Sequence, residues 1–353
     1  MWPSDRQDAS RWRSADAAST TARASDTEHA LFTGIHRFLE HHHGATEYIR
    51  HRFGLMADAR RGRHLRALMH YEVARSGVPI AGAEALDAGC GPGIYAVALA
   101  ARGARRVLAM DRFPENVATL AEIARRFALP IEAIEGDAAA IPGPAERFDL
   151  VYCREAISHF ADWEGFLREC VRVLRPGGAA VVSDGNNGAN PLVRARIARM
   201  WLRCERGPFD PVSFPDGGPL PYLFRRWMII RRELPDLSEE QTFRLGLSTT
   251  TLGGDALREA MRRYAERGEL PEKTYRAGMS VRRPEDGQRN EEALDPLDIA
   301  RRWRALGLDA RVHPHFGFGR GAPVRALNAL AERLPSLAAT LAPAYVITAR
   351  RPG

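Results

Sequence analysis

The chain has 353 residues, of which 45% are hydrophobic and 27% are charged, enough for one large α/β domain with an additional segment. No run approaches the roughly 20 apolar residues of a membrane span, and the first residues lack the apolar stretch of a signal peptide. The net charge of +7 would suit a nucleic-acid partner, but Lys273 is the only lysine, and arginine beside abundant alanine is equally typical of GC-rich coding.

The amino-terminal part of the chain falls into two segments. Residues 1–27 are rich in Ser, Ala, Asp, Arg and Thr without apolar periodicity, which predicts a disordered tail. Residues 28–77 predict helices, because one stretch runs from Arg63 to Ser76 and an earlier one places four apolar residues on a single face: Leu31, Ile35, Phe38 and Leu39. We expect this N-terminal helical segment to lie over the ligand-binding edge of a sheet.

The most informative run covers residues 85–100. A short apolar strand delivers Asp87, glycines follow at alternate positions (Gly89, Gly91 and Gly93), and an alanine-rich helix begins. Such a turn lets the backbone approach a ligand closely and directs helix N–H groups at it. The spacing departs from the dinucleotide fingerprint G-x-G-x-x-G, because Ile94 stands where that pattern needs its last glycine.

Further strands and helices alternate after this turn. Apolar strands are predicted at 106–110, 130–137, 147–154 and 179–183, and the first is followed by Asp111. A helix is predicted at 166–174, and it stops at Arg175-Pro-Gly-Gly178. An acidic residue about 20 positions after the glycine turn can bind both hydroxyls of a ribose, and Asp111 has that position.

Over about residues 78–184 the order and spacing resemble the class I S-adenosylmethionine-dependent methyltransferases that act on small molecules. The glycine turn is similar to their motif I, acidic-x-G-x-G-x-G. Three later segments of the chain resemble further motifs of this family: Gly-Asp at 136–137, Phe-Asp-Leu-Val at 148–151 and Leu-Arg-Pro-Gly-Gly at 174–178. The resemblance implies an α/β fold: a Rossmann-like, doubly wound, seven-stranded sheet with the last strand antiparallel.

The domain organisation follows from this frame. Residues 78–188 form the S-adenosylmethionine-binding core, and residues 297–353 complete it with a helix at 297–306, a strand near 309–313, helices over 324–341 and a strand at 344–349. Residues 189–296 are too long for a connection. They contain helical patterns at 194–206, 222–233 and 254–267, and we interpret them as a helical cap over the substrate.

The resemblance also implies cofactor contacts. The methionine and ribose portion is lined by Gly89, Gly91 and Gly93. Asp87 acts through the amino group, directly or by water, and Asp111 binds the ribose hydroxyls. Asp137 and Ala138 lie at the adenine, and Arg154, after the fourth strand, contacts the methionine carboxylate.

The acceptor side is less strongly indicated. His159 follows the fourth strand, where an imidazole can act as a general base, although a packing histidine is an alternative. Asn186 and Asn187 follow the fifth strand and are either pocket residues that orient a polar acceptor or turn formers. Paired arginines at 225–226, 231–232, 262–263 and 282–283 favour an acceptor with an acidic group. The run 222–230 is either core packing of the cap or a surface for a lipid-like acceptor.

The four cysteines, Cys90, Cys153, Cys170 and Cys204, show neither disulfide nor zinc spacing, so we expect a cytoplasmic protein without a bound metal. The histidines at 41–43, with His36, lack an acidic or cysteine partner at the spacing of a metal site, which favours a solvated helix end over metal binding.

We therefore predict an enzyme that transfers a methyl group from S-adenosylmethionine to an oxygen or nitrogen atom of a small molecule, oxygen first. One alternative is a nucleic-acid or protein methyltransferase, although no Asn/Asp-Pro-Pro-Tyr/Phe stretch follows the fourth strand, where Cys153-Arg-Glu-Ala stands. The other is a regulator that binds the cofactor without catalysis.

Overall fold

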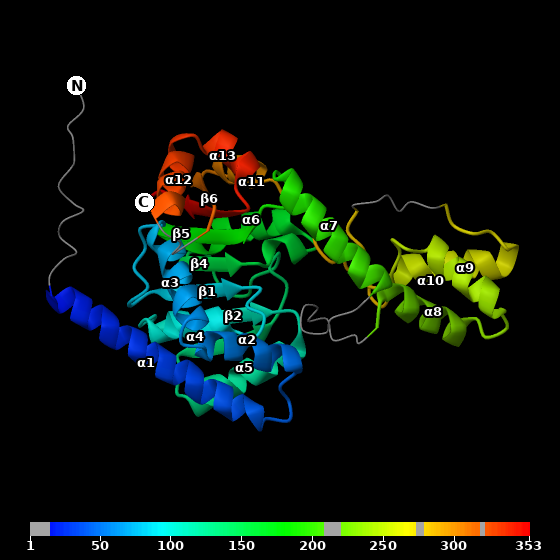
Figure 1. Ribbon diagram of the computed structural model, residues 1–353, viewed down its shortest axis with the longest axis horizontal. Coiled ribbons are helices and arrows are strands. Elements are labelled where there is room, and N and C mark those ends of the chain that lie inside the picture. The colour runs from blue at the N-terminus through cyan, green and yellow to red at the C-terminus, as the bar shows by residue number, and fades with distance from the viewer. Residues whose placement is uncertain (1–14, 208–219, 273–278, 318–321) are drawn as a thin grey trace.

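A computed structural model describes residues 15–207, 220–272, 279–317 and 322–353, and a seven-stranded sheet forms its centre (Figure 1). The strand order is β3-β2-β1-β4-β5-β7-β6, and β7 runs antiparallel to both of its neighbours. This confirms the predicted doubly wound sheet. The strands are β1 (Glu84–Ala88), β2 (Arg106–Asp111), β3 (Ile131–Glu135), β4 (Phe148–Arg154), β5 (Leu174–Gly185), β6 (Asp309–His315) and β7 (Ala344–Arg350).

Helices cover both faces of the sheet, so the central strands β1 and β4 are buried along most of their length. One core cluster joins the sheet to α4 (Ile94–Ala101), α5 (Pro114–Arg126) and the N-terminal helices. The other cluster joins it to α6 (Trp163–Val173) and α11 (Pro296–Ala305). A short 3-10 turn, Ile157–His159, follows β4.

The N-terminal segment consists of α1 (Ala15–Glu40), α2 (Glu47–Ala57) and α3 (Arg61–Ala74). The predicted disordered tail is therefore wrong from Ala15 onward, and residues 1–14 lie outside the described part. An alanine-rich stretch has high helix propensity, and here it continues into the packed face of Phe32, Ile35 and Leu39. Helix α2 lies within the segment predicted to be helical, but it was not predicted as a separate helix.

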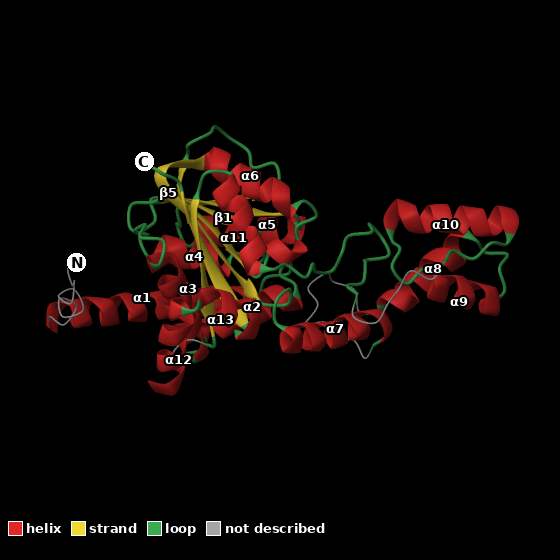
Figure 2. Ribbon diagram, turned by 90° about the horizontal axis from the view of Figure 1, so that it is seen from above, coloured by secondary structure: helices red, strands yellow, loops and turns green. Residues whose placement is uncertain are grey.

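The insert is helical, as predicted, but most of it stands beside the sheet (Figure 2). Its helices are α7 (Pro191–Arg206), α8 (Tyr222–Glu233), α9 (Glu239–Ser248) and α10 (Gly254–Arg267). We call α8, α9 and α10 the arm; they share a small core of Ile230, Leu245, Leu257 and Met261. Sequence analysis missed α9, although Ser238 and Gln241 form a capping box at its start.

The chain then returns to the sheet through α11, and α12 (Ala322–Arg333) and α13 (Pro335–Leu341) lie against β6. Among the described helices, none has the length and apolarity that crossing a bilayer requires.

Candidate active site

A cavity of about 1390 Å³ opens at the carboxyl ends of β1, β2, β4 and β5. The neighbours of β1 are β2 on one side and β4 on the other, so the chain winds away from this point in both directions. Open α/β sheets bind ligands at such a switch point. The turn at 89–92, the ends of the strands, helix α2 and residues 282–292 form the walls.

The glycine turn lies against the wall formed after β4. Gly89 has φ = 69°, and a Cβ atom there would come within 2.7 Å of the Ala156 Cβ atom. Gly91 (φ = 52°) lines the cavity and donates its N–H to Asp111 Oδ2 at 2.8 Å. Gly93 does not line the cavity. It is the N-cap of α4, and a side chain there would collide with Leu120.

Asp87 also lies behind the cavity wall. Its side chain is buried, the Ala96 amide donates to it, and Oδ2 has no hydrogen-bond partner among the described residues. Burial raises the pKa of this carboxyl to about 7. This buried oxygen without a partner lies beneath the glycine turn and would suit a site that receives a cationic ligand. The cofactor role of Asp87 stays a prediction.

Asp111 and Asp137 line the cavity at the ends of β2 and β3. Asp111 Oδ1 accepts from the Phe113 amide at 3.0 Å and from Asn116 Nδ2 at 3.1 Å, so its carboxylate is held in one orientation. Asp137 Oδ1 accepts from the Ala139 amide at 2.9 Å, and Ala138 lies beside it on the wall. These carboxylates fit the expected positions of a ribose and an adenine.

Arg154, at the end of β4, is anchored by a buried network. Glu72 of α3 is fully buried and accepts from Tyr152 Oη at 2.6 Å, Ser183 Oγ at 2.7 Å and Arg154 Nη1. Arg154 also donates from Nε to Tyr95 Oη at 2.8 Å. The N-terminal helical segment therefore supplies the carboxylate that fixes the arginine in the cavity wall. Sequence analysis missed Glu72, because nothing in its pattern separates it from an ordinary helix residue.

Three further residues at this end were missed: Tyr48 and Arg52 of α2, and Glu155. Arg154 and Arg52 contact Glu155, and the Arg154 guanidinium lowers the pKa of that carboxyl. Glu155 has φ = 53°, a strained conformation for a residue other than glycine, and such strain is frequent at functional sites.

His159 also lines the cavity. Its Nδ1 atom lies 2.5 Å from the Asn290 carbonyl oxygen. A carbonyl only accepts, so Nδ1 carries the hydrogen and Nε2 of the neutral ring keeps its lone pair. Asp184 lies close by; its Oδ2 atom is 3.4 Å from the Ser158 amide, and burial raises the pKa of this carboxyl to about 6.

Asn186 and Asn187 do not reach the cavity, and their assignment to the substrate pocket is wrong. Both side chains are buried. Asn186 Nδ2 donates to the carbonyls of Ala339 and Ala342, and Asn187 Nδ2 donates to Glu291 Oε1 at 2.8 Å. Buried amides must satisfy their hydrogen bonds, and here they join β5 to distant parts of the chain. Asp184 and Gly185, just before them, line the cavity instead.

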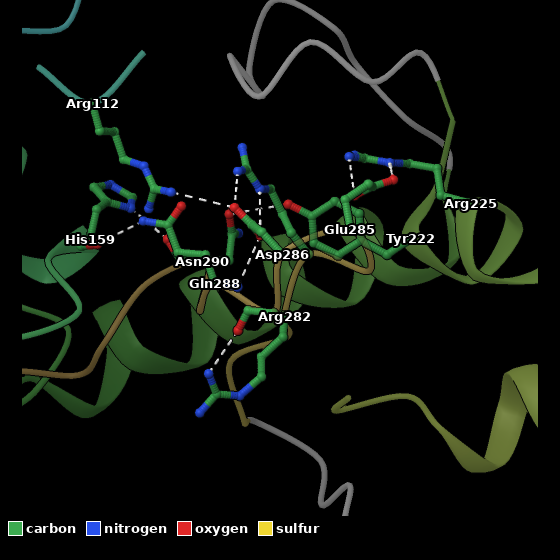
Figure 3. A network of polar contacts seen from close by, with 11 residues as sticks. Arg112, His159, Tyr222, Arg225, Arg282, Glu285, Asp286, Gln288 and Asn290 are labelled. Atoms are coloured by element: carbon green, nitrogen blue, oxygen red, sulfur yellow. Dashed lines mark hydrogen bonds and ion pairs between the residues drawn. The ribbon is translucent and has the colours of Figure 1, made fainter. Parts of the chain in front are cut away.

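Residues 282–292 form the outer wall (Figure 3). Asp286 meets Arg112 of the core at 3.4 Å and also pairs with Arg283, while Gln288 Nε2 donates to the His159 carbonyl at 3.2 Å. On the arm side, Arg225 pairs with Glu285 at 2.6 Å. Of the predicted arginine pairs, the one at 282–283 lines the cavity; the other three lie on the arm.

Comparison with known proteins agrees with this geometry. The profile of a family described as "Methyltransferase domain" matches residues 86–182. A protein of Methylocella silvestris named "Ubiquinone biosynthesis O-methyltransferase" is 40% identical over 136 residues, which cover 37% of this chain and 52% of that protein. A protein of the same name from a Methylobacterium species is 35% identical over 140 residues, which cover 38% and 55%. The chain thus spans about half the length of these curated relatives.

Among solved structures, an S-adenosylmethionine-dependent methyltransferase from Mesorhizobium loti is 17% identical, with a TM-score of 0.40 and coverage of 80% of this chain and 98% of that one. The profile match, the relatives and the glycine turn with its acidic residues concern the same part of the molecule. The domain over residues 86–182 belongs to the class I S-adenosylmethionine-dependent methyltransferases.

Proposed function

We propose that the whole chain is an enzyme that transfers the methyl group of S-adenosylmethionine to an oxygen atom of a small-molecule acceptor. One observation carries the proposal: six of the eight predicted cofactor residues line the same cavity as His159 and Asp184. The names of the relatives favour oxygen as the acceptor atom. The bound cofactor supplies an already activated methyl group, so the protein needs chiefly to align the reactants and exclude water.

The residues near His159 suit removal of a proton from an acceptor hydroxyl. His159 Nε2 has the free lone pair, because Nδ1 is held by the Asn290 carbonyl. Once the ring gains a proton, the neighbouring Asp184 carboxylate stabilises the resulting positive charge. Ser158 lines the same wall, and its buried hydroxyl interacts with Asp184 and favours the charged form of that carboxyl.

The outer wall and the neighbouring Arg112 support an acceptor with an anionic group, because four arginines line this part of the cavity: Arg112, Arg282, Arg283 and Arg289. Three carboxylates line it as well; Asp286 pairs with Arg112 and Arg283, Glu292 pairs with Arg289, and Glu291 is buried. The four cysteines are buried and free, which supports a reducing compartment such as the cytoplasm.

The test uses the purified protein with S-adenosylmethionine carrying an isotope-labelled methyl group and a metabolite extract, followed by identification of the labelled product. We expect His159→Gln to lower turnover about 100- to 10,000-fold while the affinity for S-adenosylhomocysteine is retained. The control is His43→Gln, an exposed histidine away from the cavity. Wild-type turnover in the His159 variant would disprove the base. Tight cofactor binding without any labelled product would favour the non-catalytic regulator.

A further inference from the structure

Helices α12 and α13 have an inverted amphipathic pattern. In α12 the inward positions hold small or polar residues: Ala331 is buried, and Asn328 accepts from the Phe316 amide at 2.8 Å. Leu327 and Leu330 of α12, and Leu334 directly after it, are nevertheless exposed to solvent. In α13 the alanines at 338 and 339 are buried, while the leucines at 337 and 341 are exposed. An amphipathic helix normally directs its leucines toward the core.

A sixth leucine extends this surface onto α7. Asn190, the N-cap of α7, donates from Nδ2 to the Leu341 carbonyl at 2.7 Å, so the start of α7 touches the end of α13. Figures 1 and 2 both show α13 beside the start of α7. We define the leucine face as the six residues exposed by 42% to 80%: Leu192, Leu327, Leu330, Leu334, Leu337 and Leu341. An apolar surface of this kind commonly marks an interaction site.

Positive charge adjoins the leucine face. Leu192 begins a helical stripe that continues four, seven and eleven residues later with Arg196, Arg199 and Arg203, all exposed. The only acidic residue of α7, Glu205, is buried against Arg226. An occupant of this surface must therefore offer both an apolar layer and negative charge.

We propose that the leucine face and the arginine stripe of α7 dock onto the surface of an anionic lipid bilayer. Leucines enter the boundary of the acyl chains, and arginines pair with lipid phosphates. Charge decides against a second copy of the chain, because a symmetric contact would bring two arginine stripes together. The surface lies at the cavity end of the sheet, since Leu341 precedes Ala344, which pairs with the cavity residue Gly185. The proposal does not depend on the proposed function.

The test is co-sedimentation of the full chain with vesicles of phosphatidylcholine, with or without phosphatidylglycerol. We expect binding to the anionic vesicles, weakened by salt, and little binding to phosphatidylcholine alone. The double variant Leu330→Asp/Leu337→Asp should lose this binding. Arg196→Gln/Arg199→Gln should weaken it about fivefold for each arginine removed.

Leu306→Asp serves as the control, because Leu306 has a similar exposure of 40% but lies after α11, outside the leucine face. Thermal unfolding and binding of S-adenosylhomocysteine verify that each variant is folded. A wild-type protein that stays in the supernatant with anionic vesicles overturns the proposal. Light scattering that shows a dimer, dissociated by Leu330→Asp/Leu337→Asp, overturns it in favour of an interface between copies.

Discussion

Arg154 occupies a position in which most of its donors are already used. Its guanidinium has five N–H groups, and described partners accept from Nε, Nη1 and Nη2: Tyr95, Glu72, Ser183 and Glu155. The side chain is 9% exposed and lines the cavity. A rigid arginine with a remaining N–H suits the carboxylate of the cofactor's methionine portion, whereas a mobile surface arginine would lose entropy on binding.

Arg154→Gln should therefore weaken binding of S-adenosylhomocysteine about 10- to 150-fold, the range for a lost hydrogen bond between charged groups. Methylthioadenosine lacks the amino-acid portion, so its affinity should change little. Asp111→Asn, at the expected ribose position, should weaken both ligands. Titration calorimetry measures all four affinities.

Arg147→Gln is the matched control, because Arg147 pairs with the buried Glu84 before β4 begins, at the opposite end of that strand. Removing Arg154 leaves Glu72 buried without its cation, which is costly. Glu72→Gln/Arg154→Gln avoids that cost. Equal losses for both ligands in this double variant would show that Arg154 only maintains the fold.

Asp87 should give the protein without cofactor an unusual pH dependence of stability. Burial raises the pKa of the folded carboxyl from 3.8 to about 7, so the folded state binds the proton more tightly than the unfolded chain. The free energy of unfolding is then highest below pH 4 for this group and declines as the pH rises through 7. The difference amounts to about 4 kcal/mol.

Asp87→Asn should remove this decline, so the variant gains stability relative to the wild type between pH 5 and pH 8. Urea denaturation at several pH values measures the effect. Parallel curves for the two proteins would show that Asp87 is ionised in the folded state and paired.

Among the strands and helices, those with a clear local pattern of apolar residues could be predicted from the sequence. The strands β1, β2 and β4 are largely apolar runs that end at Gly or a polar residue. The doubly wound sheet itself was predicted from the resemblance to the methyltransferase family. Helix α9 was not predicted because it has few apolar residues. Helix α2 does place Ile49, Phe53 and Met56 at helical spacing, a local signal that the prediction did not use. The start of α1 was not predicted, because a segment rich in alanine, serine and threonine is compatible with both a disordered tail and a helix.

Some residues of the candidate site could likewise be predicted from local pattern, and others could not. Gly91, Asp111, Asp137 and Arg154 follow strand ends, and strand ends meet at one edge of a parallel sheet, so sequence alone predicts their meeting in the cavity. The contact of His159 with Asn290 joins residues 131 positions apart, and no local pattern indicates it. Asn186 was misassigned for the same reason, because its partners in α13 and the following turn lie more than 150 positions away.

In the whole molecule, the arm and the sheet have separate hydrophobic cores. The arm has its own small apolar core, whereas the sheet carries two large clusters. Residues 282–292 join them, since Asp286 meets Arg112 of the core while Glu285 meets Arg225 of the arm (Figure 3). The partly exposed pair of Asp286 with Arg112 contributes about 1 kcal/mol or less, so this link couples the arm weakly to the sheet. The arm is held more firmly to α7, by the buried cluster of Trp201, Cys204, Tyr222 and Val281 and by the buried pair Arg226–Glu205.

Hydrogen exchange measured by mass spectrometry should reveal this separation. Amides in α8, α9 and α10 should exchange faster than those in β1, β4 and β5, because a small core opens at lower free energy. Addition of S-adenosylhomocysteine should slow exchange in residues 89–113 and 154–160, which surround the cavity, and leave the arm unchanged. Slower exchange in α8–α10 on ligand addition would instead show that the insert closes over the cavity, as the cap predicted from sequence requires. Asp286→Ala, which removes the acid between Arg112 and Arg283, would then abolish that protection.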